Sequence, residues 1–438
     1  MCELLRHICI KVLRYNELFE IMKQKYKILW LCNLAFSNEK LTSTGGWLQP
    51  LAEMLQRSGQ VEIFNVTSSD VKDIQINECN GIKQWVLPFY KNRLNLQIAS
   101  HKMCQAVQQI VEEVQPDLVH IWGTENIWVS IYAQGYIKTK TFVDIQGILS
   151  SYYYYYYGGL RFTELLKTIH LKELANPWCS LPYQKRSFKK RGEVEIDCLK
   201  KFKYISYQSD WVKRQISLIN PSAIFFRTKI MLREAFYSAE PWKYKDNSDT
   251  PKIFSTASGS ISYKGFHILL RAVGVLKERY PHVQLRIAGQ MKGRLLKSGY
   301  TIYLEHLIKK LGLQENVVFL GSLNESQIVK ELQGADATVI PSFVETYCLA
   351  FAESMLIGTP TVVSYAGAMP ELANHGEECL FYNSMDFQSC AYYLDQLIKD
   401  KALAEKLSVN GRKRRLIEND KNLVVNTQLD IYRSLIEE

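Results

Sequence analysis

The chain has 438 residues, 47% hydrophobic content and a formal net charge of +10. This length predicts two or three domains with large apolar cores rather than a disordered chain. The ten cysteines stand singly, without a Cys-x-x-Cys pair or metal-ligand spacing, which indicates reduced cytoplasmic thiols rather than a secreted disulfide framework. No uninterrupted apolar run of about 18 residues occurs, so a membrane-spanning helix is not expected.

The positive charge favours anionic partners. Its densest patch runs from Lys185 to Lys203. None of the usual nucleic-acid-binding modules can be read in the sequence, so no nucleic-acid partner is expected. Phosphate-bearing substrates and an anionic membrane surface explain the charge more economically, with peripheral attachment to the inner face of the cell membrane. The alternative is that the patch is a solvated helix face.

Residues 1–21 form an N-terminal extension that is not a signal peptide. They are interrupted by charges and have no small-residue cleavage site. Met22 precedes the first strand pattern and is a natural start. The extension is either an upstream-start artefact, which we favour, or a short amphipathic helix.

The N-terminal half alternates short apolar runs with helical patterns, as doubly wound α/β folds do. Helices are predicted at 48–57 and 97–114. The predicted strands are 27–32, 61–66, 85–88, 118–122, 141–145 and 204–207.

A second alternating series predicts a second Rossmann-like domain. Its predicted strands are 252–256, 284–288, 317–320, 337–340 and 361–364. Residues 240–251 are the most polar, turn-rich stretch between the two series and form the best linker candidate. The predicted organisation is an N-terminal domain at 22–239, a second domain at 240–420 and a terminal helix at 421–438, with a cleft between the domains.

Two carboxylates carry most of the functional information. Glu345 follows the apolar strand 337–340, and Glu353 lies eight positions later inside a helix that Gly358-Thr359-Pro360 ends. Ligands of open α/β sheets lie at the carboxyl ends of the strands, where helix N-termini favour a diphosphate. One carboxylate near a reacting sugar and one on a ribose would use both residues. The alternative for Glu353, a solvated helix position, fits poorly with its apolar neighbours.

The segment 341–364 resembles the Glu-x7-Glu signature of the family 4 retaining glycosyltransferases, which have the GT-B fold. The matching positions are Pro341-Ser342, Glu345, Glu353-Ser354-Met355, Gly358-Thr359-Pro360 and Gly367-Ala368. The resemblance extends from Lys27 onward and is strongest in the C-terminal half. It implies two Rossmann-like domains facing across a cleft, and a terminal helix that crosses back onto the first domain.

The resemblance also implies roles for individual residues. Glu345 and Lys264 would be catalytic, and Gln146 and Gly147 would lie near the acceptor and the transferred sugar. The implied donor-binding residues are Glu353, Gly45, Gly46, Gly265, Thr346, Tyr347, Cys348 and Leu349.

Two departures from the family pattern matter. An Arg that often accompanies the Lys is absent, its places being taken by Ser258, Gly259 and Ser260. Arg286 and Lys292 are candidates to meet the second phosphate charge. Many relatives have His where this chain has Gln146, and Gln cannot titrate, so this position holds no acid–base catalyst.

The sequence shows no Asp-x-Asp motif and no metal-ligand spacing among its eight His. No metal or cofactor is therefore expected, apart from a nucleotide-diphosphate sugar as the donor substrate.

The predicted function is retaining transfer of a hexosyl unit to a glycan or lipid-linked acceptor, in bacterial cell-surface polysaccharide biosynthesis. Two alternatives remain: a nucleotide-sugar epimerase of GT-B architecture, and a non-catalytic sugar-nucleotide-binding partner.

Overall fold

The computed structural model describes residues 25–37, 46–89, 97–247, 249–256, 261–289 and 298–438. Residues 1–21, Gly45, Ser258, Gly259, Ser260 and Lys292 lie outside the described residues, so the predictions made for them stay predictions.

The first domain contains an eight-stranded sheet with the order β3-β4-β2-β1-β5-β6-β7-β8. All neighbours pair in parallel except β3 and β4, which are antiparallel. The strands are β1 Tyr26–Leu31, β2 Val61–Ser69, β3 Gln75–Cys79, β4 Ile82–Pro88, β5 Leu118–Trp122, β6 Thr141–Asp144, β7 Tyr204–Tyr207 and β8 Ile224–Arg227. The six predicted strands are present, whereas β3 and β8 were not predicted.

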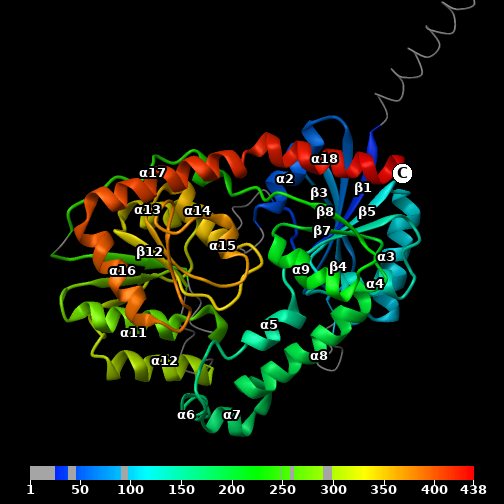
Figure 1. The fold of residues 1–438 in the computed structure, drawn as a ribbon. Helices are drawn as coiled ribbons and strands as arrows, with labels where there is room; N and C mark the ends of the chain where they lie inside the picture. The colour runs from blue at the N-terminus through cyan, green and yellow to red at the C-terminus, as the bar shows by residue number, and fades with distance from the viewer. Residues whose placement is uncertain (1–24, 38–45, 90–96, 248, 257–260, 290–297) are drawn as a thin grey trace, which may run out of the picture.

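The second domain contains a fully parallel six-stranded sheet with the order β11-β10-β9-β12-β13-β14. Its strands are β9 Lys252–Ser255, β10 Gln284–Ile287, β11 Val317–Phe319, β12 Ala337–Ile340, β13 Thr361–Ser364 and β14 Leu380–Tyr382. Only β14 was not predicted. The two Rossmann-like sheets lie side by side, each flanked by helices, as Figure 1 shows.

Helices connect the strands in both domains. In the first they are α2 Leu48–Arg57, α3 His101–Val114, α4 Trp128–Ala133, α5 Leu149–Tyr155, α6 Phe162–Leu166, α7 Leu171–Ala175, α8 Leu181–Leu199 and α9 Asp210–Ile219. The short α10 Glu234–Tyr237 follows and buries Phe236 in the core of the second domain. In the second they are α11 Phe266–Lys277, α12 Gly299–Lys310, α13 Glu325–Gly334, α14 Leu349–Ile357, α15 Met369–Leu372, α16 Phe387–Lys399 and α17 Lys401–Glu418, followed by the terminal α18 Lys421–Glu437.

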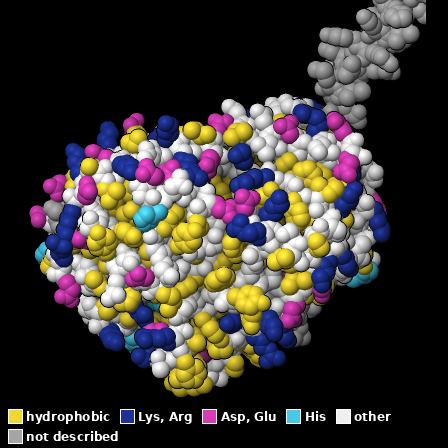
Figure 2. Space-filling view, viewed as in Figure 1, with side chains coloured by type: hydrophobic (Ala, Val, Ile, Leu, Met, Phe, Trp, Pro, Cys, Tyr) yellow, Lys and Arg dark blue, Asp and Glu magenta, His cyan; other side chains and the backbone are white. Residues whose placement is uncertain are grey.

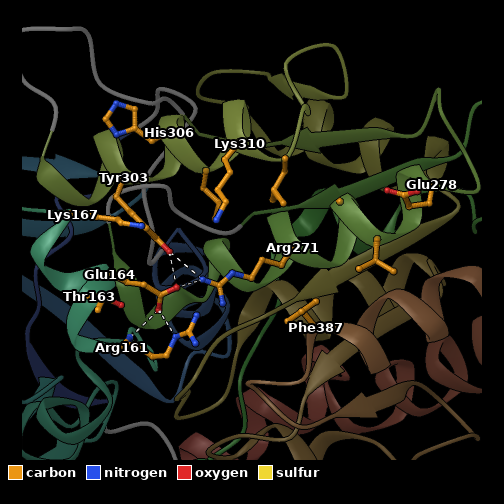
Figure 3. Close-up of a pocket in the computed structure, with 14 residues that line it drawn as sticks. Arg161, Thr163, Glu164, Lys167, Arg271, Glu278, Tyr303, His306, Lys310 and Phe387 are labelled. Carbon is orange, nitrogen blue, oxygen red and sulfur yellow. Dashed lines mark hydrogen bonds and ion pairs between the residues drawn. The ribbon is translucent and has the colours of Figure 1, made fainter.

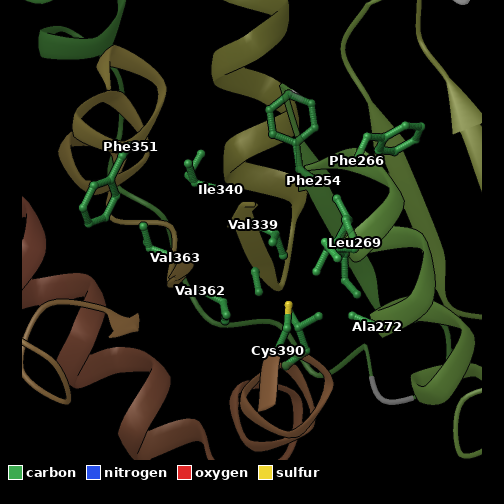
Figure 4. Packing of buried hydrophobic residues seen from close by; sticks show 14 of the residues in the cluster. Phe254, Phe266, Leu269, Ala272, Val339, Ile340, Phe351, Val362, Val363 and Cys390 are labelled. Carbon is green, nitrogen blue, oxygen red and sulfur yellow. The ribbon is translucent and has the colours of Figure 1, made fainter. Parts of the chain in front are cut away.

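The core of the second domain explains why its strands are so apolar. Every residue of β12 and β13 is buried. Strands of a parallel sheet with helices on both faces have no solvent side, so they consist of nearly continuous apolar runs. Figure 4 shows Val339, Val362 and Val363 among the side chains of α11, α14 and α16. This packing holds the strand ends, and the loops after them, in fixed positions.

The terminal helix α18 packs on the first domain, which confirms the predicted crossover (Figure 1). Tyr432 is completely buried there, and its hydroxyl accepts a hydrogen bond from Trp30 Nε1 at 3.0 Å. The same hydroxyl lies 2.7 Å from Nδ1 of His120. Burial lowers the pKa of His120 well below its usual value, so the ring is neutral at physiological pH. The C-terminal helix is therefore part of the N-terminal core.

The predicted linker is anchored to the second domain. Trp242 is only 6% exposed, and its Nε1 donates to the carbonyl of Ala335 at 2.7 Å. Its backbone N–H also donates to the carbonyl of Ile357 at 2.8 Å. The polar composition of residues 240–251 therefore conceals one buried aromatic anchor.

Replacing Tyr432 with Phe should destabilise the protein, because it leaves the buried nitrogens of Trp30 and His120 without their partner. The expected loss is about 1–3 kcal/mol, measured by urea unfolding. Tyr392→Phe, at a position 58% exposed, is the control and should cost little. Equal stability of the two variants would contradict a structural role for the buried hydroxyl.

Candidate active site

Glu345 lies in the loop after β12, as predicted, and is 8% exposed. The turn at Gly367-Ala368 fixes its backbone, since the N–H of Ala368 donates to the carbonyl of Glu345 at 2.9 Å. Gly367 has φ of +55°, and a Cβ there would lie 2.3 Å from the same carbonyl oxygen. Only glycine allows these two chain segments to approach so closely.

Lys264 pairs with Glu345, so the two residues predicted to be catalytic do meet. The Lys264 Nζ lies 2.6 Å from Oε1 of Glu345. Burial opposes the charge of Lys264, but the carboxylate outweighs it and raises the pKa of the lysine. The loop carrying Lys264 approaches the Glu345 loop closely at Gly265, where φ is +71° and a Cβ would lie 1.9 Å from the carbonyl oxygen of Pro341.

The helix α14 starts directly beside this pair. No side chain caps its N-terminus, so the first N–H groups and the positive end of the helix dipole remain available to an anion. The residue at the N-cap, Cys348, has φ of +79°, an uncommon conformation for a residue other than glycine. Burial raises the pKa of its thiol, which keeps it uncharged. The site therefore combines one ammonium group with an open helix N-terminus.

Glu353 is buried inside α14 and forms an ion pair with two parallel hydrogen bonds. Arg233 Nε and Nη2 donate to its two carboxylate oxygens at 2.6 and 2.7 Å. Burial raises the pKa of Glu353, and the guanidinium partly offsets this effect. Each carboxylate oxygen keeps a further lone pair for a ligand hydroxyl. Because Arg233 lies just after the first domain's last strand, this ion pair links the end of the first domain to α14.

The other residues predicted to bind the donor have different surroundings in the structure. Gly46 is buried just ahead of α2. The hydroxyl of Tyr347 accepts a hydrogen bond from Asn419 Nδ2 at 2.6 Å, so this side chain is engaged at the end of α17. Arg286, a candidate for the second phosphate charge, is paired with Glu331 at 2.6 and 2.8 Å. Leu349 is half-buried in the first turn of α14.

The two domains touch at the predicted acceptor loop. The hydroxyl of Thr346 donates to the carbonyl of Gln146 at 2.6 Å, and Ser209 Oγ donates to the carbonyl of Thr346 at 2.8 Å. Nearby, the Glu371 carboxylate accepts the N–H groups of Asp210 and Trp211, at 2.6 and 2.7 Å, at the start of α9. These contacts bring the loop that carries Glu345 against the first domain.

The side chain of Gln146 is held within the first domain. Its Nε2 donates to the buried carboxylate of Asp144, while Thr124 Oγ1 donates to the carbonyl of Gly147 at 2.9 Å. Burial raises the pKa of Asp144 to about 6. Gln146 therefore takes part in the interface through its backbone carbonyl.

The tyrosine tract at 152–157 is part of the domain contact, a role that composition alone could not assign. The ring of Tyr152 lies 5.6 Å from that of Tyr263. Gly158 follows with φ of +60°, and its carbonyl oxygen lies 2.9 Å from Nε2 of His267. A Cβ on Gly158 would lie 2.2 Å from the carbonyl oxygen of Ser262. The glycine thus allows the first domain to contact the segment that carries Lys264.

Glu125 is a candidate that the sequence interpretation missed. It follows β5 and lies beside Gly147, with one carboxylate oxygen buried and unpartnered among the described residues. Desolvation, reinforced by the nearby Glu195 carboxylate, raises its pKa to about 7. No motif includes Glu125, and a single acidic residue after a strand does not indicate that its carboxylate will be buried. A perturbed carboxylate near the domain contact is a functional-site candidate.

Neither a metal centre nor a membrane span is found in the described part of the chain. No group of three or more His, Cys, Asp or Glu there could hold a metal ion. The helices within the same residues include none long and apolar enough to cross a membrane.

Comparison with known families places the second domain. Residues 238–414 match the family "Glycosyl transferases group 1". An uncharacterized glycosyltransferase of Methanocaldococcus jannaschii is 26% identical over 260 residues, covering 54% of this chain and 65% of that protein. A D-inositol 3-phosphate glycosyltransferase of Corynebacterium urealyticum is 32% identical over 178 residues, covering 39% of this chain and 40% of its own. The chain thus spans about two thirds or less of these relatives.

Solved structures agree over nearly the whole chain and support the GT-B fold. A sucrose-phosphate synthase from Thermosynechococcus elongatus superposes with a TM-score of 0.72 at 15% identity, covering 94% of this chain and 100% of that one. Anabaena HepE in complex with UDP-glucose gives a TM-score of 0.64 at 17% identity, covering 93% and 99%. The whole chain therefore has the GT-B fold, and its residues 238–414 resemble a glycosyl transferases group 1 domain.

Glu125→Gln should change the pH dependence of stability. Because the folded-state pKa of Glu125 is raised, the wild type loses stability as pH rises from the ordinary Glu range through about 7. The variant lacks this loss, so its stability relative to wild type should increase between about pH 5 and pH 8 in urea unfolding. Glu193→Gln, at an exposed position, is the control and should show no such change. An unchanged pH profile in the Glu125 variant would contradict the raised pKa.

Proposed function

We propose that this chain is a metal-independent, retaining family 4 glycosyltransferase that moves a hexosyl unit from a nucleotide-diphosphate sugar to a glycan or lipid-linked acceptor. The observation that carries the proposal is the 2.6 Å pair of Lys264 and Glu345 beside the uncapped N-terminus of α14. The group 1 match at 238–414 supports transfer chemistry. Anabaena HepE, which shares the fold, was solved in complex with UDP-glucose, and this supports a nucleotide-sugar donor.

The leaving diphosphate would be stabilised by fixed positive charge. The Lys264 ammonium has three N–H donors, of which Glu345 uses one, so the others can face a phosphate. The start of α14 adds its free N–H groups and dipole, and Gly46 adds backbone at the opposite domain. Preorganised donors of this kind stabilise charge that develops in a transition state, without a bound divalent ion.

Glu345 and Glu353 would hold the two ends of the donor. Glu345 is positioned by Gly367 and Lys264 next to the diphosphate-binding groups, where its carboxylate can accept a sugar hydroxyl. Glu353 would accept the ribose hydroxyls, with Arg233 holding both of its carboxylate oxygens in place. Each carboxylate has a cationic partner, Lys264 for Glu345 and Arg233 for Glu353.

The acceptor would approach from the first domain. Gln146 has an amide side chain bound to Asp144, so this residue offers no base, and the proposed reaction does not use Glu125 as one. A front-face reaction fits this layout, in which the leaving phosphate takes the proton of the acceptor hydroxyl and configuration is retained. We place the reaction in bacterial cell-surface polysaccharide biosynthesis, in the cytoplasm at an anionic membrane surface.

Glu345→Gln should lower turnover strongly while leaving nucleotide affinity near wild type, because the residue acts on the sugar. Donor consumption should be followed in EDTA, where the wild type is expected to stay active, with Glu377→Gln at an exposed position as the control.

The fresh product should keep the anomeric configuration of the donor in NMR spectra. An inverted product, an epimerised donor, or activity lost in EDTA and restored by metal would each overturn this mechanism.

Glu353→Ala should weaken nucleotide binding by about tenfold or more, because two charge-assisted hydrogen bonds to the ribose are lost. Calorimetry with UDP, GDP and ADP would measure this for whichever nucleotide binds the wild type. Glu377→Ala, at an exposed position, is the control and should leave nucleotide affinity unchanged. Unchanged affinity in a folded Glu353→Ala variant would contradict ribose recognition by Glu353.

A further inference from the structure

Two short helices of the first domain, α6 and α7, have their amphipathicity reversed. In α6, Phe162 and Leu166 are 74% and 51% exposed, whereas Glu164 is 7% exposed. In α7, Leu171 and Leu174 are 85% and 68% exposed, whereas Glu173 is 3% exposed. Helices of water-soluble domains ordinarily bury their apolar face and expose their charges. These two helices instead direct apolar side chains outward.

The inward carboxylates show that this orientation is built into the fold. Glu164 forms an ion pair with Arg271 of α11 and lies 3.3 Å from the hydroxyl of Tyr303 on α12, as Figure 3 shows. Glu173 accepts the N–H of Gly299 at 2.7 Å. A Cβ at Gly299 would lie 1.6 Å from the carbonyl oxygen of Thr168, so this approach requires glycine. The second domain therefore holds the outward apolar face in place.

Cationic groups lie behind this face. A cavity of about 560 Å³ is lined by residues of α6, α11 and α12. Lys167 and Lys310 line it, and neither has an ion-pair partner within the described residues. Figure 3 shows both lysines on the cavity wall with the Glu164–Arg271 pair beneath them. The cavity beside α6 thus carries two lysines without an ion pair among the described residues, and Glu278 is a further charged residue of its lining.

The apolar face continues onto neighbouring elements and is rich in aromatic side chains. Tyr154, Trp178 and Tyr183 are 75%, 56% and 39% exposed. Residues 154–183 contain nine of the 23 large hydrophobic side chains that are exposed among the described residues. Figure 2 shows hydrophobic side chains gathered with Lys and Arg at the end of the molecule where Figure 1 places α6 and α7. Such a contiguous patch marks an interaction site.

The exposed charge of the segment that forms the face is of one sign. Residues 151–192 contain eight Lys and Arg but only two acids, Glu164 and Glu173, and both acids are buried. The exposed charge of this segment is therefore entirely positive. Lys185, Arg186, Lys189 and Lys190 follow on α8 and border the apolar side chains.

We propose that residues 151–192 dock on a bilayer that contains anionic lipids, with the side chains of α6, α7 and Trp178 entering the interfacial region. Tyr and Trp favour that depth, and Lys and Arg bind the anionic headgroups. A second copy fits less well, because a symmetric contact would set two basic borders against each other. The proposal rests on the proposed transferase and names its membrane partner. Docking here would bring α5 near a lipid-linked acceptor, and α5 carries Tyr152, which lies beside Lys264.

Flotation of the purified full chain with vesicles tests this proposal without any sugar nucleotide, so it can fail independently of the transferase assignment. The wild type should bind mixed phosphatidylcholine–phosphatidylglycerol vesicles at least about tenfold more than phosphatidylcholine alone, and high salt should weaken the binding. The triple substitution Leu171→Ser, Leu174→Ser and Trp178→Ser should abolish binding and leave the unfolding midpoint unchanged or higher.

The control triple substitution Leu218→Ser, Val409→Ser and Ile417→Ser removes side chains that are 86%, 65% and 61% exposed elsewhere. It should bind vesicles as the wild type does. Equal binding to neutral vesicles, or binding that survives the Leu171, Leu174 and Trp178 substitutions, overturns the proposal. Self-association in sedimentation that those substitutions abolish assigns the face to a second copy, and capture by soluble polyglutamate with no vesicle binding assigns it to an acidic polypeptide.

Discussion

The ion pair of Lys264 and Glu345 is the interaction on which the site depends. It joins two loops of the second sheet, one after β9 and one after β12, across 2.6 Å, with Glu345 buried and Lys264 half-buried. Glycines at 265 and 367 let the surrounding backbones approach closely enough to form it. Burial of a charged group is favourable only where a partner compensates its lost hydration, and each member of this pair is that partner for the other.

The contact between the domains follows from polar groups that meet at the same loop. Thr346, next to Glu345, binds the carbonyl of Gln146, and Glu371 caps α9 of the first domain. The terminal helix α18 adds a covalent tether, since it leaves the second domain and buries Tyr432 in the first. The two domains are thereby held together by hydrogen bonds between their loops and by one terminal helix that packs on the first domain.

Buried polar contacts between the domains also explain the orientation of α6 and α7. Their two acids turn inward to bind groups on α11 and α12, and Phe162, Leu171 and Leu174 are left on the outward side. Burial of a charge is favourable only with a partner, and that partner comes from the other domain. The arrangement therefore exposes Leu171 and Trp178 as a consequence of how the domains join.

The sequence by itself determined the parallel sheets and the loop that carries Glu345. The strands 118–122, 204–207, 337–340 and 361–364 and the helix 48–57 have the predicted bounds, because local periodicity and turn residues specify them. Tertiary structure alone decided the rest. The strand β3 is exposed and polar, Arg233 meets Glu353 across 120 positions, and Glu125 becomes perturbed only beside Gly147. Which side of α6 faces inward depended likewise on Arg271. Such pairings depend on desolvation and distance between distant segments, and no local pattern encodes either.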